Sequence, residues 1–111
     1  MADQNHFEKS INAASVGAQA LSADGDISST STVVTVDSTA GDVSVNLPGQ
    51  AAAAGSQITV VKLVSANNVI VKVQSGDSLG GVVDATDTLA TGTAYLVGVY
   101  ASTGDSWAKV V

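Results

Sequence analysis

The sequence contains no cysteine and no arginine, and its four cationic side chains are all lysines. Without cysteine the chain has no disulfide, no thiolate metal ligand and no thiol nucleophile. Ten acidic residues give a formal net charge of −6 and an isoelectric point near 4.1. Because phosphate groups are bound by cationic surfaces, we expect neither a nucleic acid nor an anionic membrane surface as a partner.

Long apolar segments are missing as well. No apolar run approaches the roughly 18 residues of a membrane-spanning helix. No charged stretch followed by an apolar stretch marks a signal peptide. The 111 residues correspond to one domain, or to a small domain with a tail. We therefore expect a protein that folds in water without covalent cross-links.

Valine and threonine are what the sequence has in excess. Valine occurs 18 times and threonine 10 times, whereas leucine and glutamate are scarce. β-Branched side chains favour strands, so the composition predicts a β-protein. A β-domain of about 80 residues buries only about 60% of its unfolded surface. A core of this size is marginal alone, so we expect the chain to form an oligomer.

The composition changes near residue 31. Residues 1–31 hold the only glutamate and the only histidine but no β-rich run. We interpret 1–31 as an N-terminal arm with a flexible connector at 22–31, and 32–111 as the β-domain. In the arm, apolar residues recur at heptad spacing, which is compatible with a short amphipathic helix or with an extended arm that orders on a partner. These residues are Phe7, Ile11, Ala14, Ala18 and Leu21.

Alternating and β-branched runs predict the strands of the β-domain. The predicted strands are 32–37, 42–47, 57–64, 69–73, 82–83, 93–100 and 106–111. The run 57–64 is apolar on both faces and is predicted to be central. Residues 65–68 and 102–105 are predicted to be hairpin loops. The expected fold class is all-β: a small β-sandwich or barrel of short antiparallel strands preceded by the N-terminal arm.

Side chains that carry chemistry are few. His6 lies close to the N-terminus, where a catalytic triad is not expected. Asp24-Gly25-Asp26 lacks the remaining ligands of a calcium loop, whose twelfth position falls on Thr35. Gly80-Gly81 has no accompanying lysine, so a phosphate loop is not predicted.

The remaining aspartates fall at predicted turns and strand ends, where their carboxylates cap backbone amides. Within the predicted β-domain they are Asp37, Asp42, Asp77, Asp84, Asp87 and Asp105. This placement argues against a paired-carboxylate glycosidase. We expect no enzyme, no cofactor and no metal site.

Three aromatic residues in the β-domain are candidates for binding or packing. Tyr95, Tyr100 and Trp107 could form a sugar-stacking platform. Tyr95 and Tyr100 have opposite parity on one predicted strand and so face opposite sides of it. We therefore expect all three residues in the core or in a subunit interface.

The sequence from Val43 to Val111 resembles a β-module of tailed-bacteriophage virion proteins, found in head decoration (cement) proteins, head fibres and tail-fibre tips. The resemblance rests on Val45-Asn-Leu-Pro48, Gly55, Ile58-Thr-Val-Val61, Asn68-Val-Ile-Val71, Gly76-Asp-Ser-Leu-Gly80, Tyr95-Leu-Val97, Gly104-Asp-Ser-Trp107 and Val110-Val111. It implies a homotrimer with a structural role.

The 111-residue length and the short arm favour a capsid decoration protein. Such a protein is made in the host cytoplasm, binds the major capsid protein on the outer surface of the head, and stabilises the shell. Phe7, Ile11 and Leu21 are then the expected capsid-binding residues, because no small local core can bury them. The alternative is a receptor- or glycan-binding tip of a virion or cell-surface fibre. Without a collagen-like or coiled-coil stalk, a head fibre is disfavoured.

Overall fold

The structure is a computed structural model that describes residues 17–111, and within this range it contains eleven strands and no helix. The strands are β1 (Ala18–Leu21), β2 (Gly25–Asp26), β3 (Val33–Val36), β4 (Val43–Asn46), β5 (Gln57–Lys62), β6 (Val69–Lys72), β7 (Ser78–Leu79), β8 (Val82–Val83), β9 (Thr86–Leu89), β10 (Leu96–Ser102) and β11 (Trp107–Lys109).

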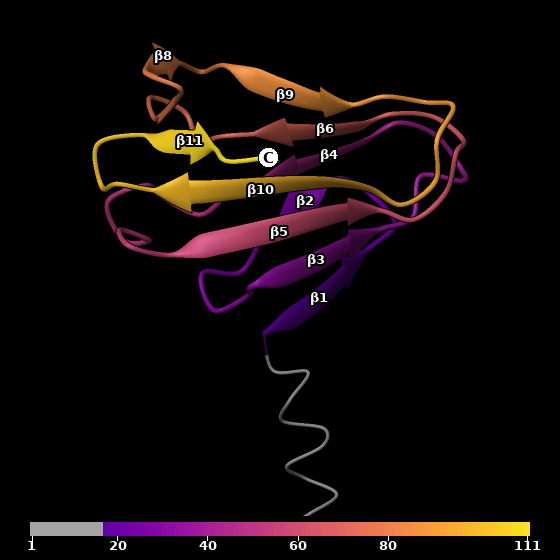
Figure 1. Ribbon diagram of the computed structural model, residues 1–111, viewed down its shortest axis with the longest axis horizontal. Coiled ribbons are helices and arrows are strands. Elements are labelled where there is room, and N and C mark those ends of the chain that lie inside the picture. Colours follow the sequence, from indigo (N-terminus) through magenta and orange to yellow (C-terminus); the bar gives the residue numbers. More distant parts are fainter. Residues whose placement is uncertain (1–16) are drawn as a thin grey trace, which may run out of the picture.

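The strands form two sheets that pack face to face (Figure 1). A seven-stranded sheet has the order β1-β3-β5-β10-β11-β7-β8, and a four-stranded sheet has the order β2-β4-β6-β9. The expectation of a small all-β fold is confirmed. β5 is an inner strand, as expected, because it pairs with both β3 and β10.

The first six strands wind around the core instead of folding back in hairpins. The chain passes alternately from the seven-stranded to the four-stranded sheet, so β1, β3 and β5 pair in parallel, and so do β2, β4 and β6. The expectation of antiparallel strands is therefore wrong for this half of the domain. The loop 65–68 is not a hairpin, because β6 pairs with β4 and not with β5.

Antiparallel pairing closes the two sheets in the second half of the chain. β10 pairs with β5 and with β11, and β9 pairs with β6. The expected hairpin at 102–105 is confirmed by the β10–β11 pair.

Two successive coils of the chain have the same spacing. Val33 is in register with Thr59 in one sheet, and Val43 is in register with Val69 in the other. Both pairs have the same sequence offset, so residues 33–46 match residues 59–72 without an insertion. The domain is thus partly built from a repeated coil, which the sequence analysis did not detect.

A ladder of side-chain caps joins the coils at one end of the sandwich. The Asp24 carboxylate accepts the Ser44 N–H at 2.7 Å, and the Asp42 carboxylate accepts the Asn68 N–H at 2.8 Å. The Asn68 side chain in turn accepts the N–H of Thr91 at 2.8 Å. Each of these three residues directly precedes a strand of the four-stranded sheet. They have the backbone-capping role expected of aspartate at turns.

The inner faces of both sheets supply one core of aliphatic residues and two aromatic residues. Trp107 and Tyr100 are its largest fully buried side chains. Lys62 is also fully buried, because it occupies an inward position of β5 beside Val36 and Leu96 in the neighbouring strands. Its Nζ donates to the carbonyl oxygens of Val64 and Thr93. These bonds satisfy an ammonium group that would otherwise be costly to bury.

The β-domain begins earlier than the expected boundary at Thr32. β1 and β2 lie within the segment interpreted as arm and connector, and β1 adds to the edge of the seven-stranded sheet. The side chain of Gln19 orders this segment: it donates to the carbonyl of Asp26 at 2.9 Å and accepts the N–H of Ser28 at 2.8 Å. The connector is therefore folded, and a helix through Leu21 is excluded.

Candidate interaction surface

The two sheets have outer faces of different chemistry. In the four-stranded sheet, inward valines alternate with outward polar residues, the pattern of a sheet with one solvated face. The outward residues there are Asp26, Ser44, Asn46, Ile70, Lys72, Thr86 and Thr88. This face carries both charges and hydroxyl groups.

The strands of the seven-stranded sheet do not alternate in this way, because valines occupy outward as well as inward positions. Its outward positions in β1, β3, β5, β10 and β11 are Ala18, Ala20, Val33, Thr35, Gln57, Thr59, Val61, Val97, Val99, Ala101 and Ala108. We call this set the outer valine face. None of these residues is ionisable, although the whole chain carries a formal charge of −6.

Strand register arranges the outer valine face in rows. Thr35, Val61 and Val97 form one row across β3, β5 and β10. Val33, Thr59 and Val99 form the next. Val33 and Val97 are 40% and 44% exposed. Cross-strand neighbours of this kind pack side by side, so the rows make a continuous surface of valine and threonine side chains without charge.

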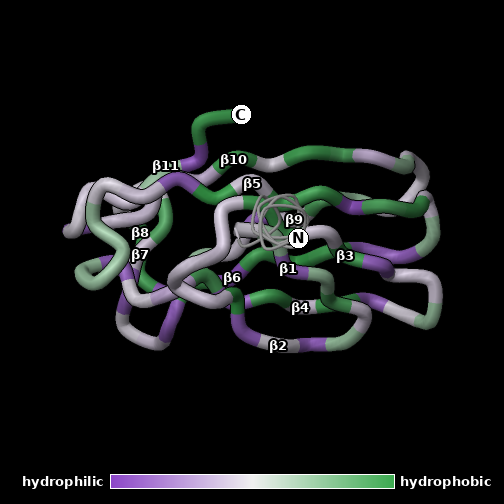
Figure 2. The backbone as a smooth tube through the Cα atoms, turned by 90° about the horizontal axis from the view of Figure 1, so that it is seen from below, coloured by the Kyte–Doolittle hydropathy of each residue, from purple (hydrophilic) through white to green (hydrophobic). Residues whose placement is uncertain are grey.

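The chain end extends this apolar character. The N–H of Val110 donates to the carbonyl of Val99 at 2.7 Å, which places the C-terminal residues beside β10. Val110 and Val111 are 54% and 67% exposed. In Figure 2 the C-terminal end carries the colour of hydrophobic residues. Exposed apolar residues grouped in this way are typical of an interaction surface.

Tyr95 lies immediately before β10 and is 71% exposed, so it is not a core residue. Its φ is 58°, a left-handed backbone conformation that is unusual for a bulky residue. The preceding loop is held on both sides: the N–H of Gly92 donates to the carbonyl of Ser65 at 2.7 Å, and Lys62 donates to the carbonyl of Thr93. The loop thus presents an aromatic side chain from a fixed backbone. A subunit contact at Tyr95 stays a prediction.

Tyr100 and Trp107 lie in the core, which was one of the two positions expected for them. The indole N–H of Trp107 donates to the carbonyl of Pro48 at 2.9 Å. Neither side chain is exposed, so neither can stack on a sugar or touch a second subunit directly. A shared platform of three aromatic residues is therefore excluded.

A cluster of polar side chains links the two sheets beside β10. The hydroxyl of Tyr100 donates to Asp87 Oδ2 at 2.6 Å, and Lys109 Nζ lies 2.8 Å from the same oxygen. Burial raises the pKa of the Tyr100 phenol, and the charge of Asp87 raises it further. Burial alone would raise the pKa of Asp87, but the bonds from Lys109 and Tyr100 lower it below its usual value. The cluster is a structural link between the two sheets.

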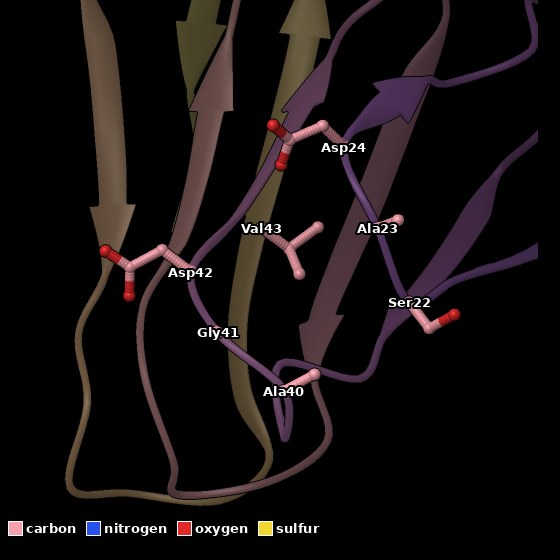
Figure 3. A pocket seen from close by; sticks show the side chains of 7 residues that line it. All are labelled: Ser22, Ala23, Asp24, Ala40, Gly41, Asp42 and Val43. Atoms are coloured by element: carbon pink, nitrogen blue, oxygen red, sulfur yellow. The ribbon is translucent and has the colours of Figure 1, made fainter.

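A shallow depression of about 420 Å³ lies between the β1–β2 and β3–β4 loops (Figure 3). Its two carboxylates are Asp24 and Asp42, and Val43 lies between them in this view. Each carboxylate already accepts a backbone N–H of the ladder. Within residues 17–111 no group of three or more His, Asp or Glu side chains is arranged to hold a metal ion. The depression offers no chemistry beyond its capping bonds.

The expected capsid-binding residues are only partly covered by the structure. Phe7 and Ile11 lie outside the described residues, as does His6. Leu21 is in β1, is half-buried and packs against the core. The expectation that no local core can bury Leu21 is wrong, because β1 joins the sheet and turns this side chain inward.

Sequence reasoning missed the outer valine face, although its signal was present. The run 57–64 is apolar on both faces, and this pattern was interpreted only as a sign of a central strand. The structure buries Ile58 and Val60 in the core but places Thr59 and Val61 on the outer surface. The same pattern also indicates that the outer face of this strand lacks charged residues.

Among residues 17–111 no helix is long and apolar enough to span a membrane. A comparison of the chain with known protein families and with curated proteins found no match.

Proposed function

We propose that the protein is a structural virion protein: a homotrimeric capsid decoration protein that binds the major capsid protein on the outer surface of a phage head. The observation that carries the proposal is the outer valine face, an apolar surface without ionisable groups on an acidic chain. A surface of this kind acts by burial against protein, which is how a structural component works. The resemblance of residues 43–111 to phage virion modules supplies the biological setting.

The described ionisable groups support a structural role over a catalytic one. Asp24 and Asp42 cap backbone amides, and Asp87 is tied to Lys109 and Tyr100. Lys62 is enclosed in the core and bonds to two carbonyl oxygens. Each of these groups therefore has a structural bonding role that accounts for its position in the fold.

Within this proposal the capsid contact lies in residues 1–16, the part of the expected arm outside the described residues. Phe7 and Ile11 remain the proposed anchors, whereas Leu21 belongs to the β-domain. Burying one such side chain contributes about 1.5–3 kcal/mol. Three arms on one trimer would add avidity to this modest contact.

The experiment mixes the protein with expanded heads of the phage that encodes it and locates bound protein by cryo-electron microscopy. The proposal predicts copies at regular lattice positions, and loss of binding when Phe7→Ala and Ile11→Ala are combined. The matched control combines Gln4→Ala and Asn5→Ala, polar changes in the same arm that should leave binding intact. Density only at the tail or at a few vertices would contradict a decoration role.

The second candidate function is a receptor- or glycan-binding tip, which the exposed Tyr95 on its anchored loop favours. Aromatic rings are common anchors at binding surfaces. A glycan array measured with the wild-type protein and with Tyr95→Ala discriminates the two functions. Glycan binding that depends on Tyr95, together with no binding to heads, would favour the tip.

A further inference from the structure

We propose that the outer valine face is the surface through which copies of this chain contact one another. The inference rests on the homotrimer of the proposed function and deepens it, because it assigns the contact between subunits to one face of one sheet. The polar outer face of the four-stranded sheet then remains in solvent, and the arm remains available for the capsid.

The distribution of charge is the first argument for a second copy as the occupant. A symmetric contact brings identical residues of several copies close together, so any charge on it meets a like charge. Each copy carries a formal charge of −6, yet the outer valine face holds none of it. The opposite outer face, with Asp26 and Lys72, shows that this chain does place charges on the outer face of a sheet.

The shape and chemistry of the face are the second argument. The rows Thr35-Val61-Val97 and Val33-Thr59-Val99 consist of β-branched side chains. Such side chains have few rotamers and lose little conformational freedom when they are buried. An acidic chain that had to recognise a different, basic partner would do so with its carboxylates. This face has none and suits a partner as acidic as itself.

The third argument is that exposed residues at the border of the outer valine face continue its apolar character. Tyr95 precedes the first residue of β10 and is fixed by its loop, and Val110 lies beside Val99. The two exposed residues border β10, the strand that supplies Val97 and Val99. An exposed tyrosine directly before this strand and an exposed valine beside it have the composition typical of a subunit contact.

The first test replaces Val97 with lysine and measures the mass by sedimentation equilibrium. Val97 is 44% exposed in the single chain, so Val97→Lys should fold, and emission from the buried Trp107 reports whether it does. We expect its mass to fall from three chains to one. The matched control is Thr88→Lys, the same change on the outer face of the four-stranded sheet, which should keep the wild-type mass. A folded Val97→Lys protein with the wild-type mass would overturn the inference.

A second measurement does not require disrupting the contact. The chain has no cysteine, so Val97→Cys and Thr88→Cys each carry a single thiol. We expect Val97→Cys to react with a thiol reagent about tenfold more slowly than Thr88→Cys, because access limits the reaction. Equal rates at the wild-type mass would overturn the inference.

Deleting residues 1–16 tests whether this segment, and not a second copy of the chain, covers the outer valine face. If Val97→Cys became fully reactive after the deletion while the mass stayed at three chains, the arm would be the cover and the inference would fail. If any of these tests overturned the inference, the result expected from the capsid-binding experiment would stay the same. Conversely, a wild-type mass of one chain contradicts the homotrimer of the proposed function itself.

Discussion

The hydroxyl of Tyr100 donates a 2.6 Å hydrogen bond to Asp87 Oδ2, and this bond joins an inner strand of the seven-stranded sheet to the edge strand of the four-stranded sheet. Lys109 in β11 contacts the same carboxylate oxygen. The ring of Tyr100 lies over Gly98, two residues earlier on the same face of β10. The side chain of Tyr100 therefore links the two sheets where β10 lies beside β9.

Replacing Tyr100 with phenylalanine should weaken this link. Tyr100→Phe removes a hydrogen bond to an ionised carboxylate, so we expect the free energy of unfolding at neutral pH to fall by about 1.5–3 kcal/mol. Urea denaturation measures the change. Tyr95→Phe is the matched control, because Tyr95 is exposed and its hydroxyl should contribute less than about 0.5 kcal/mol. Equal stability of the two variants would contradict the assigned role of the bond.

Acid should destabilise the protein through Asp87. The pKa of Asp87 in the fold lies below the ordinary value of an aspartate, so the unfolded chain binds a proton at higher pH than the folded chain does. The associated stability is complete above the unfolded pKa and is lost as pH falls through the lower, folded pKa. We expect the thermal midpoint to decline below about pH 4. Asp87→Asn should flatten this decline; an unchanged decline would assign it to other carboxylates, such as Asp37, whose pKa is lowered by hydrogen bonds from Thr39.

Gly98 should not tolerate a side chain. A Cβ at this position would lie 2.9 Å from ring carbons of Tyr100, so the ring must move or the strand must shift. We expect Gly98→Ala to cost about 1–3 kcal/mol in the free energy of unfolding, the usual cost of overpacking. Gly41→Ala is the control, because a Cβ there meets nothing within 4 Å. Comparable stability of the two alanine variants would show that the Tyr100 ring is not confined.

Trp107 should be the most costly side chain of the core to truncate. It is fully buried and donates its indole N–H to Pro48. Trp107→Ala should lower the free energy of unfolding by about 3–5 kcal/mol. The wild-type fluorescence should be blue-shifted relative to the unfolded chain, which chemical denaturation measures directly. Emission that does not shift on unfolding would contradict the burial of this residue.

Much of the strand content could be predicted from the sequence, and the pairing could not. Val43, Val45 and Leu47 share a parity, and β4 forms where this alternation predicts it. Alternation, however, identifies the two faces of a strand and carries no information on its partner. The 65–68 loop has the composition of a hairpin, yet it carries the chain to the opposite sheet.

The N-terminal strands and the outer valine face were missed for different physical reasons. β1 lacks β-branched residues, and its order comes from pairing with β3 and from the bonds of Gln19, which no local pattern encodes. The outer valine face is built from β1, β3, β5, β10 and β11, so it exists only once the register is known. Only Val61, in a run that is apolar on both faces, gave a local sign of it.

Sedimentation equilibrium of the intact wild-type chain at micromolar concentration tests the central claim, that this protein acts by assembly. The account predicts a mass three times that of the 10.9 kDa chain, because a small valine core and an uncharged apolar sheet face are both stabilised by association. A mass of 10.9 kDa over the whole concentration range, with cooperative unfolding, would contradict it.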